Sequence, residues 1–247
     1  FVQAGGDNAL LDLHGNTVNG TALPDRKIGV LGLGTGVGNA FAEFDSHGHM
    51  LSNAAGTVGA LNLTIDEEDA PHFSRARERY ILAGQKDIIT LIDYVAFVTE
   101  NQLGAAATFS ATKINALAGV EKGEDIVIGN SEHDTALKIA GKYMGRTIAG
   151  IQAMEAAEQA TVNSAKQTSM YLIGGGIGSS PLGDEIIRYA QEEMERLDIT
   201  SPALVRMPQH MAECGAAATV LNDLMRTPSF TLAASHPLSL ENGRVYG

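Results

Sequence analysis

The chain has 247 residues, of which 44% are hydrophobic, so it can bury a large core in one large domain or in two small ones. Its 17 basic and 29 acidic residues give a formal net charge of −12, which opposes binding to nucleic acid and to anionic membrane surfaces. The single cysteine, Cys214, excludes a disulfide framework, and no apolar run approaches the ~20 residues of a membrane span, so we expect a cytoplasmic globular protein without a membrane partner.

The first predicted element is a buried strand that leads into a glycine-rich turn. Residues 28–33 form a short apolar run. The turn after it contains Gly34, Thr35, Gly36 and Gly38. Glycines leave backbone N–H groups open and let the main chain come close to an anion. Residues 39–45 precede a turn-forming segment and are too few for a packing helix, so the pattern predicts strand, glycine turn, strand.

Helical patterns occupy the middle of the chain. Residues 70–82 and 86–103 look helical and predict a small helical insertion. The longest periodic segment runs from Ser131 to about Val162, with Ser131 and Asp134 as its predicted capping pair. One face of this helix should pack on a sheet. Its predicted members are Ala136, Ile139, Tyr143, Met144, Ile148, Ile151 and Met154.

A second connection from a strand to glycines follows in the last third of the chain. The strand is predicted at residues 170–173. The glycines after it are Gly174, Gly175 and Gly176. Ser180 and Pro181 predict the N-cap and first turn of a helix over residues 182–197. The remaining predicted elements are a strand at 203–207, a helix at 213–225 and an irregular tail over 227–247.

A dinucleotide site is one interpretation of the first turn, because residues 28–34 resemble the opening strand of a Rossmann fold. The spacing departs from that fingerprint. G-x-G-x-x-G begun at Gly32 requires glycine at Val37, and begun at Gly34 it requires glycine or alanine at Asn39. The helix that should follow the turn is also missing from the pattern. An NAD(P)-dependent oxidoreductase remains an alternative.

The second interpretation rests on several segments that resemble motifs of the glucokinase and ROK sugar kinases. Residues 33–38 are similar to the family's second phosphate motif, and residues 53–60 are similar to its sugar-contact segment. Residues 145–150 resemble its long helix, residues 171–177 its adenosine motif, and residues 214–217 the start of its final helix. The segments occur in the family's order.

The resemblance implies an α/β fold of the ribonuclease-H-like, actin-like ATPase class, in which helices flank a mixed sheet, with a helical insertion near 70–125. The implied activity is phosphorylation of a hexose sugar with ATP and Mg²⁺. In this interpretation residues 1–26 end a truncated N-terminal lobe, residues 27–226 form the C-terminal nucleotide-binding lobe, and residues 227–247 are the irregular tail. Relatives are often dimers, so a homodimer is an open alternative.

The resemblance also implies roles for individual residues. The ATP-binding residues would be Gly34, Thr35, Gly36, Gly38, Gly174, Gly175 and Gly176. The sugar-binding residues would be Asn8, Asn53, Gly56 and Thr57. Asp7 is the available catalytic base, which would accept the proton of the sugar hydroxyl. The alternative for Asp7 is a cap or turn residue. No side chain is assigned as a metal ligand.

The sugar-contact segment departs from the family's pattern. The family has Gly-Glu-x-Gly-His, whereas this chain has Thr57 in place of the glutamate and Ala60 in place of the histidine. The carboxylate and the imidazole that would hold sugar hydroxyls are therefore both missing. These two positions support a further alternative, a non-catalytic or regulatory relative that binds nucleotide or sugar without turnover.

Overall fold

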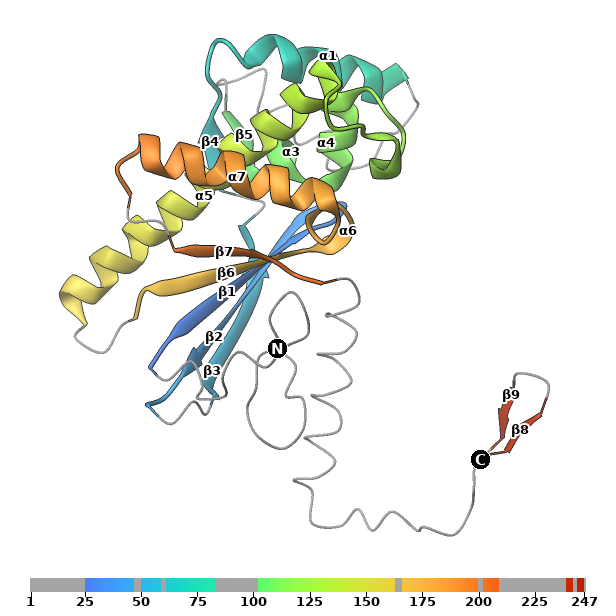
Figure 1. Ribbon diagram of the computed structural model, residues 1–247. Helices are drawn as coiled ribbons and strands as arrows, with labels where there is room; N and C mark the ends of the chain where they lie inside the picture. The colour runs from blue at the N-terminus through green and yellow to red at the C-terminus, as the bar shows by residue number, and fades with distance from the viewer. Residues whose placement is uncertain are drawn as a thin grey trace.

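A five-stranded mixed sheet forms the centre of the protein in a computed structural model, which describes residues 25–46, 50–58, 61–82, 102–162, 166–199, 202–208, 239–241 and 244–246 (Figure 1). The sheet has the strand order β3-β2-β1-β6-β7. These strands are β1 (Lys27–Leu33), β2 (Val37–Phe44), β3 (Met50–Thr57), β6 (Thr168–Gly174) and β7 (Ala203–Arg206). The pairs β1–β2 and β2–β3 are antiparallel, whereas β1–β6 and β6–β7 are parallel.

The helices lie in two groups. In Figure 1, α5 (Ser131–Thr161) and α7 (Pro181–Arg196) run along the sheet, and a smaller helical group lies beyond them. That group comprises α1 (Ala70–Leu82), α3 (Ala105–Phe109), α4 (Ala111–Ala118) and the strand pair β4 (Asn62–Thr64) and β5 (Gln102–Gly104). The short helix η2 (Gly123–Asp125) also belongs to this group, whereas α6 (Gly175–Gly178) connects β6 to α7 at the edge of the sheet. The predicted α/β class, a mixed sheet flanked by helices with a helical insertion, is confirmed.

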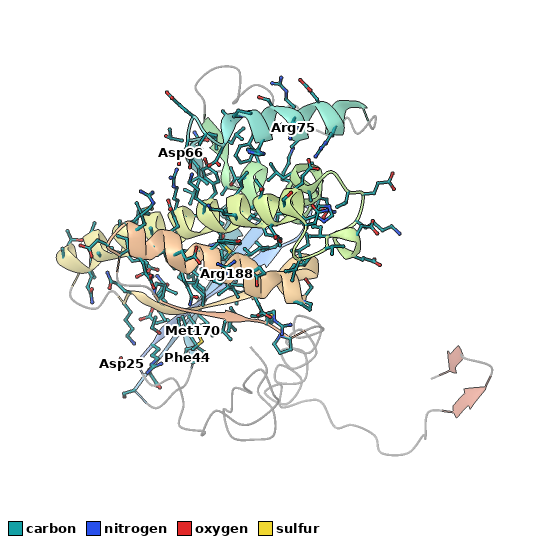
Figure 2. All side chains as sticks on the ribbon, turned by 45° about the horizontal axis from the view of Figure 1, so that its top comes forward. Asp25, Phe44, Asp66, Arg75, Met170 and Arg188 are labelled. Atoms are coloured by element: carbon teal, nitrogen blue, oxygen red, sulfur yellow. The ribbon has the colours of Figure 1, made fainter. Side chains whose placement is uncertain are left out.

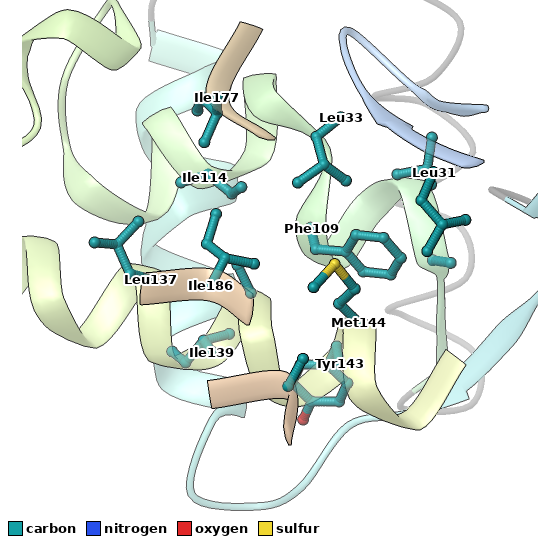
Figure 3. Close-up of a cluster of buried hydrophobic side chains, with 14 of the residues drawn as sticks. Leu31, Leu33, Phe109, Ile114, Leu137, Ile139, Tyr143, Met144, Ile177 and Ile186 are labelled. Atoms are coloured by element: carbon teal, nitrogen blue, oxygen red, sulfur yellow. The ribbon is translucent and has the colours of Figure 1, made fainter. Parts of the chain in front are cut away.

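One hydrophobic core joins both groups of helices to the sheet. Leu31 and Leu33 of β1 are fully buried, as are Phe109 at the end of α3 and Ile114 of α4. Figure 3 shows these side chains gathered with Met144 of α5 in one cluster. The helical group is therefore held to the sheet by shared apolar burial, which is the main stabilising term of the fold.

A buried polar cluster fixes β1 and β6 together at their amino ends. Glu155 of α5 is 6% exposed and accepts hydrogen bonds from the backbone N–H of Thr168 (2.8 Å) and from its hydroxyl (2.7 Å). The ammonium of Lys27 lies 2.7 Å from the same carboxylate. Burial raises the pKa of the neighbouring Tyr171 phenol to about 12. The cluster ties the starts of both strands to one helix.

Glycines let α5 and α7 approach closely. A Cβ atom at Gly141 would lie 2.6 Å from the carbonyl oxygen of Ile186, and one at Gly145 would lie 2.6 Å from that of Ala190. Both distances are far below van der Waals contact. Side chains at these positions would therefore push the two helices apart.

The helix caps were predicted with mixed success. Ser180 caps α7 and Pro181 occupies its first turn, as predicted. The predicted cap of α5 at Ser131 is wrong, because Asn130 is the N-cap residue. Its side chain accepts hydrogen bonds from the N–H groups of Glu132 and His133. Asparagine is as good an N-cap as serine, and Asn130 has the extended backbone that the position needs.

Several other predictions need correction. Met154 is 66% exposed, whereas Gln152 and Glu155 beside it are 8% and 6% exposed, so Met154 lies on the outer face of α5. The end of the helix predicted at 86–103 is wrong, since Gln102–Gly104 is strand β5, paired with β4. Short strands β8 (Ser239–Glu241) and β9 (Arg244–Tyr246) pair within the predicted irregular tail. The helix predicted at 213–225 lies outside the described residues.

None of the described helices combines the length with the apolar character that a membrane crossing requires.

The strand β3 was not among the predicted elements, although its residues include part of the sugar-contact segment.

The helix packing can be tested with two alanine substitutions in α5. Gly141→Ala should lower the free energy of unfolding by about 1–3 kcal/mol, because it overpacks the contact with α7. Gly150→Ala is the matched control, since Gly150 is exposed and no described atom lies within 4 Å of its added Cβ. It should raise stability by about 0.5–1 kcal/mol through helix propensity. Urea unfolding measures both, and equal stabilities for the two variants would contradict the packing.

Candidate functional site

The two glycine turns meet at one edge of the sheet, which we call the glycine edge (residues 34–38 and 174–178). Strands β1 and β6 are parallel, and Gly32 pairs with Gly174. Because parallel strands end at the same edge, the segments after them become neighbours. Gly175 has φ +85°, and an added Cβ would lie 2.5 Å from the carbonyl oxygen of Leu33. Glycine at this position is therefore required by the fold itself.

The turn between β1 and β2 is a tight connection that is itself tied down. The N–H of Gly34 donates to the carbonyl of Gly36 at 3.1 Å. The carbonyl of Gly34 accepts from the N–H of Ala111, at the start of α4, at 2.8 Å. Thr35 at the tip is exposed. The predicted strand, glycine turn and strand are confirmed, and the strand β2 stands where a dinucleotide-binding fold would have a helix.

Three glycines at this edge have no role in the packing of the described residues. A Cβ at Gly36, Gly38 or Gly176 would find no described atom within 4 Å. None of the three has a positive φ. Neither strain nor crowding by the described residues accounts for glycine there, whereas close approach of a ligand to the backbone would.

Ser110 is a residue at this edge that the sequence did not reveal. It is the N-cap residue of α4, is 1% exposed and makes no side-chain capping bond. Its hydroxyl has no hydrogen-bond partner among the described residues. An unpaired buried hydroxyl costs about 1–3 kcal/mol. Serine before a helical run is a capping signal, but that signal does not tell which distant turn the cap will approach.

The predicted sugar-binding residues lie partly at this edge. Thr57 of β3 is paired with Gly38, and Gly56 is paired with Asn39, so both backbones lie beside the glycine turn. Asn53 is farther along β3, opposite Ala42. Asp7 and Asn8 lie outside the described residues. Thus the structure brings together the two glycine turns and the end of β3.

A second candidate is a cavity of about 550 Å³ lined by charged side chains of α5, α7 and the segment that leads into α1. Figure 2 shows Asp66 on that segment. Carboxylate oxygens of Asp66, Glu68 and Asp69 lie within 4.8 Å of one another, a grouping that could hold a cation. The ammonium of Lys142 already fills this role, at 2.6, 2.8 and 2.8 Å from them. Burial alone would lower the pKa of Lys142, but these hydrogen bonds raise it above its usual range.

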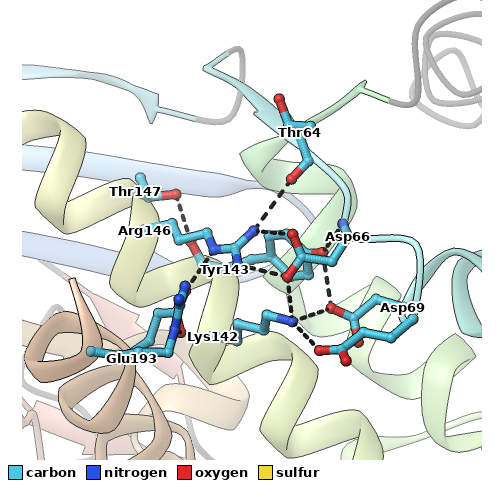
Figure 4. Close-up of polar contacts among 10 residues, drawn as sticks. Thr64, Asp66, Asp69, Lys142, Tyr143, Arg146, Thr147 and Glu193 are labelled. Atoms are coloured by element: carbon cyan, nitrogen blue, oxygen red, sulfur yellow. Dashed lines mark hydrogen bonds and ion pairs between the residues drawn. The ribbon is translucent and has the colours of Figure 1, made fainter.

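Arg146 completes the charged network beside this cavity (Figure 4). Its guanidinium binds Asp66 through two parallel hydrogen bonds of 2.8 and 2.7 Å and donates from Nε to Glu193 at 2.6 Å. Hydrogen bonding from Arg146 holds the pKa of Asp66 well below its usual range. The hydroxyl of Tyr143 donates to Asp69 and accepts from the N–H of Asp66. We call these residues the Asp66 clamp: Asp66, Asp69, Lys142, Tyr143, Arg146 and Glu193.

The clamp satisfies its own charges. Lys142 contacts one oxygen of each of three carboxylates, and Arg146 is bound on both sides. A ligand at this cavity would have to displace internal ion pairs that are already well formed. The glycine edge, where backbone surface lies open, is therefore the better candidate for a binding site.

A comparison with protein-family models finds no match, and a search of curated proteins finds none. Similar solved structures include a ROK family protein from Streptococcus pneumoniae in complex with sucrose, with TM-score 0.46 and 14% identity, which covers 80% of this chain and 59% of that one. A ROK hexokinase from Thermus thermophilus has TM-score 0.45 and 15% identity, and the match covers 81% of this chain and 58% of that one. A glucokinase from Balamuthia mandrillaris in complex with glucose has TM-score 0.43 and 12% identity, and the match covers 84% of this chain and 57% of that one.

The chain thus spans less than two thirds of the length of these structures. They belong to the group of proteins that the sequence motifs resemble.

The clamp has a testable dependence on pH. The pKa of Asp66 is lower in the folded state than in the unfolded state, so the ionised carboxylate stabilises the fold. This stabilisation is fully present above the unfolded pKa of about 3.9, and it is lost as the pH falls toward the folded pKa. Asp66→Asn should lower the free energy of unfolding by about 2 kcal/mol at pH 7. The difference from the unmodified protein should shrink below about pH 4.

Urea unfolding between pH 3 and 7 measures this difference. Asp184→Asn is the control, because Asp184 forms an exposed ion pair with Arg206 and should contribute below about 1 kcal/mol. A difference for Asp66→Asn that is the same at pH 3 and pH 7 would show that its charge does not stabilise the fold.

Proposed function

We propose that this chain is the nucleotide-binding part of an ATP-dependent sugar kinase, and that it binds the phosphates of ATP at the glycine edge. The observation that supports this most is the open backbone at Gly36, Gly38 and Gly176, for which neither backbone strain nor packing among the described residues requires glycine. Exposed N–H groups of such turns bind phosphate oxygens, and they stabilise the negative charge that develops during phosphoryl transfer. The resemblance of the motifs to those of the glucokinase and ROK sugar kinases is the reason to propose ATP rather than another phosphate compound.

The two turns have different tasks in this proposal. The turn at residues 34–38 holds the terminal phosphates, and the exposed Thr35 donates its hydroxyl to a phosphate oxygen. Residues 174–176 bind the adenosine side. Bound ATP with Mg²⁺ supplies the phosphoryl group. No described side chain is assigned to the metal ion.

The sugar would lie beside the end of β3. Gly56 and Thr57 are paired with residues next to the first glycine turn, so a hydroxyl group bound there would lie near the phosphates. Asn8 and Asn53 are the other proposed sugar contacts, and Asp7 is the proposed base that accepts the hydroxyl proton. The proposed substrate class is a hexose, and the proposed location is the cytoplasm.

A second candidate function is nucleotide or sugar binding without turnover. Thr57 stands where the resembling kinases have a glutamate, and Ala60 stands where they have a histidine. A protein that binds Mg-ATP and fails to phosphorylate any hexose, with the remainder of the kinase present, would have this function.

Thermal unfolding with excess nucleotide tests the proposal. A ligand at about 100 times its Kd stabilises the folded state by about 2.7 kcal/mol, which is about 5–10 °C for a chain of this size. Mg-ATP or Mg-ADP should produce this shift, and NADH should not. A shift with NADH alone, or with none of the three, would overturn the proposal.

Gly36→Val locates the site. The side chain projects into open space, so the unliganded protein should keep its stability within about 1 kcal/mol. Its isopropyl group would block approach of the phosphates, and the affinity for Mg-ATP should fall by about tenfold or more. Gly150→Ala, on the outside of α5, should bind like the unmodified protein. Equal affinity of Gly36→Val would place the nucleotide elsewhere.

A further inference from the structure

We infer that the Asp66 clamp positions the start of α4 against the first glycine turn, so that Asp66 and Arg146 act as positioning residues for the nucleotide site. The inference rests on the proposed function for its effect on ligand binding. Its structural half concerns the contact between Ala111 and Gly34, and it can be measured without any ligand.

The first step connects the clamp to the strand pair of the helical group. Asp66 follows β4 in the chain, and β4 pairs with β5 through Asn62–Gly104 and Leu63–Leu103. The N–H of Ala105 also donates to the carbonyl of Leu61 at 2.9 Å. The position of the clamped segment therefore sets the position of β5.

The second step connects β5 to the glycine edge. Strand β5 leads directly into α3, and α4 follows after Ser110 alone. The N–H of Ala111 then donates to the carbonyl of Gly34 at 2.8 Å. A displacement of β5 would be passed through this short continuous segment to the turn that is proposed to hold the phosphates.

The third step concerns what holds the start of α4. Ser110 makes no capping bond with its side chain, so the helix start lacks the local support that a serine usually provides. The bond from Ala111 to Gly34 and the burial of Phe109 and Ile114 remain. A helix start with weak local support depends more strongly on the segments that lead to it.

The other end of the clamp lies on the two long helices α5 and α7. Arg146 lies in the middle of α5, and Glu193 lies on α7, the two helices that lie along the sheet. The Arg146 guanidinium bridges Asp66 and Glu193, with side-chain exposures of 18%, 34% and 6% for the three residues. The segment before α1 is thereby fastened to the helices that cover the sheet.

Arg146→Gln tests the inference, because it removes the charge and the paired hydrogen bonds to Asp66. Arg188→Gln is the matched control: Arg188 pairs only with Glu185 and Glu192 of its own helix, among the ion pairs that the structure shows. Arg146→Lys keeps the charge without the paired geometry and should give an intermediate result. Hydrogen exchange by NMR and the Kd for Mg-ADP are measured for all three.

We expect the exchange of the Ala111 amide to become at least about fivefold faster in Arg146→Gln, beyond any change in the amides of residues 186–190 in α7. The Kd for Mg-ADP should rise about fivefold or more. Both should stay unchanged in Arg188→Gln. If the exchange of the Ala111 amide accelerates no more than the exchange of the amides of residues 186–190 in α7, the clamp contributes only general stability and the inference is wrong.

The two proposals fail in different ways. If the unmodified protein binds no nucleotide, the proposed function is overturned, and the exchange of Ala111 still decides the structural half. If the unmodified protein binds Mg-ADP and Arg146→Gln binds it equally well, positioning by the clamp is overturned and the proposed function stands.

Discussion

The parallel pairing of β1 with β6 is the constraint on which the rest of the structure depends. It places Gly32 opposite Gly174, so that the segments after both strands emerge at one edge. The contact is so close there that only glycine fits at Gly175 beside the backbone of Leu33. Glu155 fixes the same pair of strands at their amino ends. The glycine edge is therefore a product of strand register.

The two candidate sites differ in how their polar groups are used. In the Asp66 clamp, cations and carboxylates are paired with each other, and the depressed pKa of Asp66 reflects how well its charge is held. At the glycine edge, the open faces of Gly36 and Gly176 leave backbone surface without a neighbour among the described residues. Binding favours the second arrangement, because a ligand adds contacts there and has few to displace.

Local signals in the sequence predicted local structure well. The apolar run before Gly34, the brief segment after it and the Ser180-Pro181 start of α7 each define an element within a few residues. Asn130 was missed because two neighbouring residues can both cap a helix. The clamp and the bond from Ala111 to Gly34 could not be predicted, because they join residues far apart: Asp66 and Arg146 are 80 positions apart in the chain. Only the fold brings such groups together.

The order of the strands has a consequence for how the chain folds. Strands β1, β2 and β3 are consecutive and can pair as soon as they are made, but β1 must wait for β6, which follows all the helical insertion and α5. Contacts between such distant segments form slowly. During synthesis, Leu31 and Leu33 would therefore stay incompletely covered until α3, α4 and α5, which pack in the same cluster, have left the ribosome. The apolar surface of this early hairpin is therefore the part of the nascent chain that exposes it to aggregation.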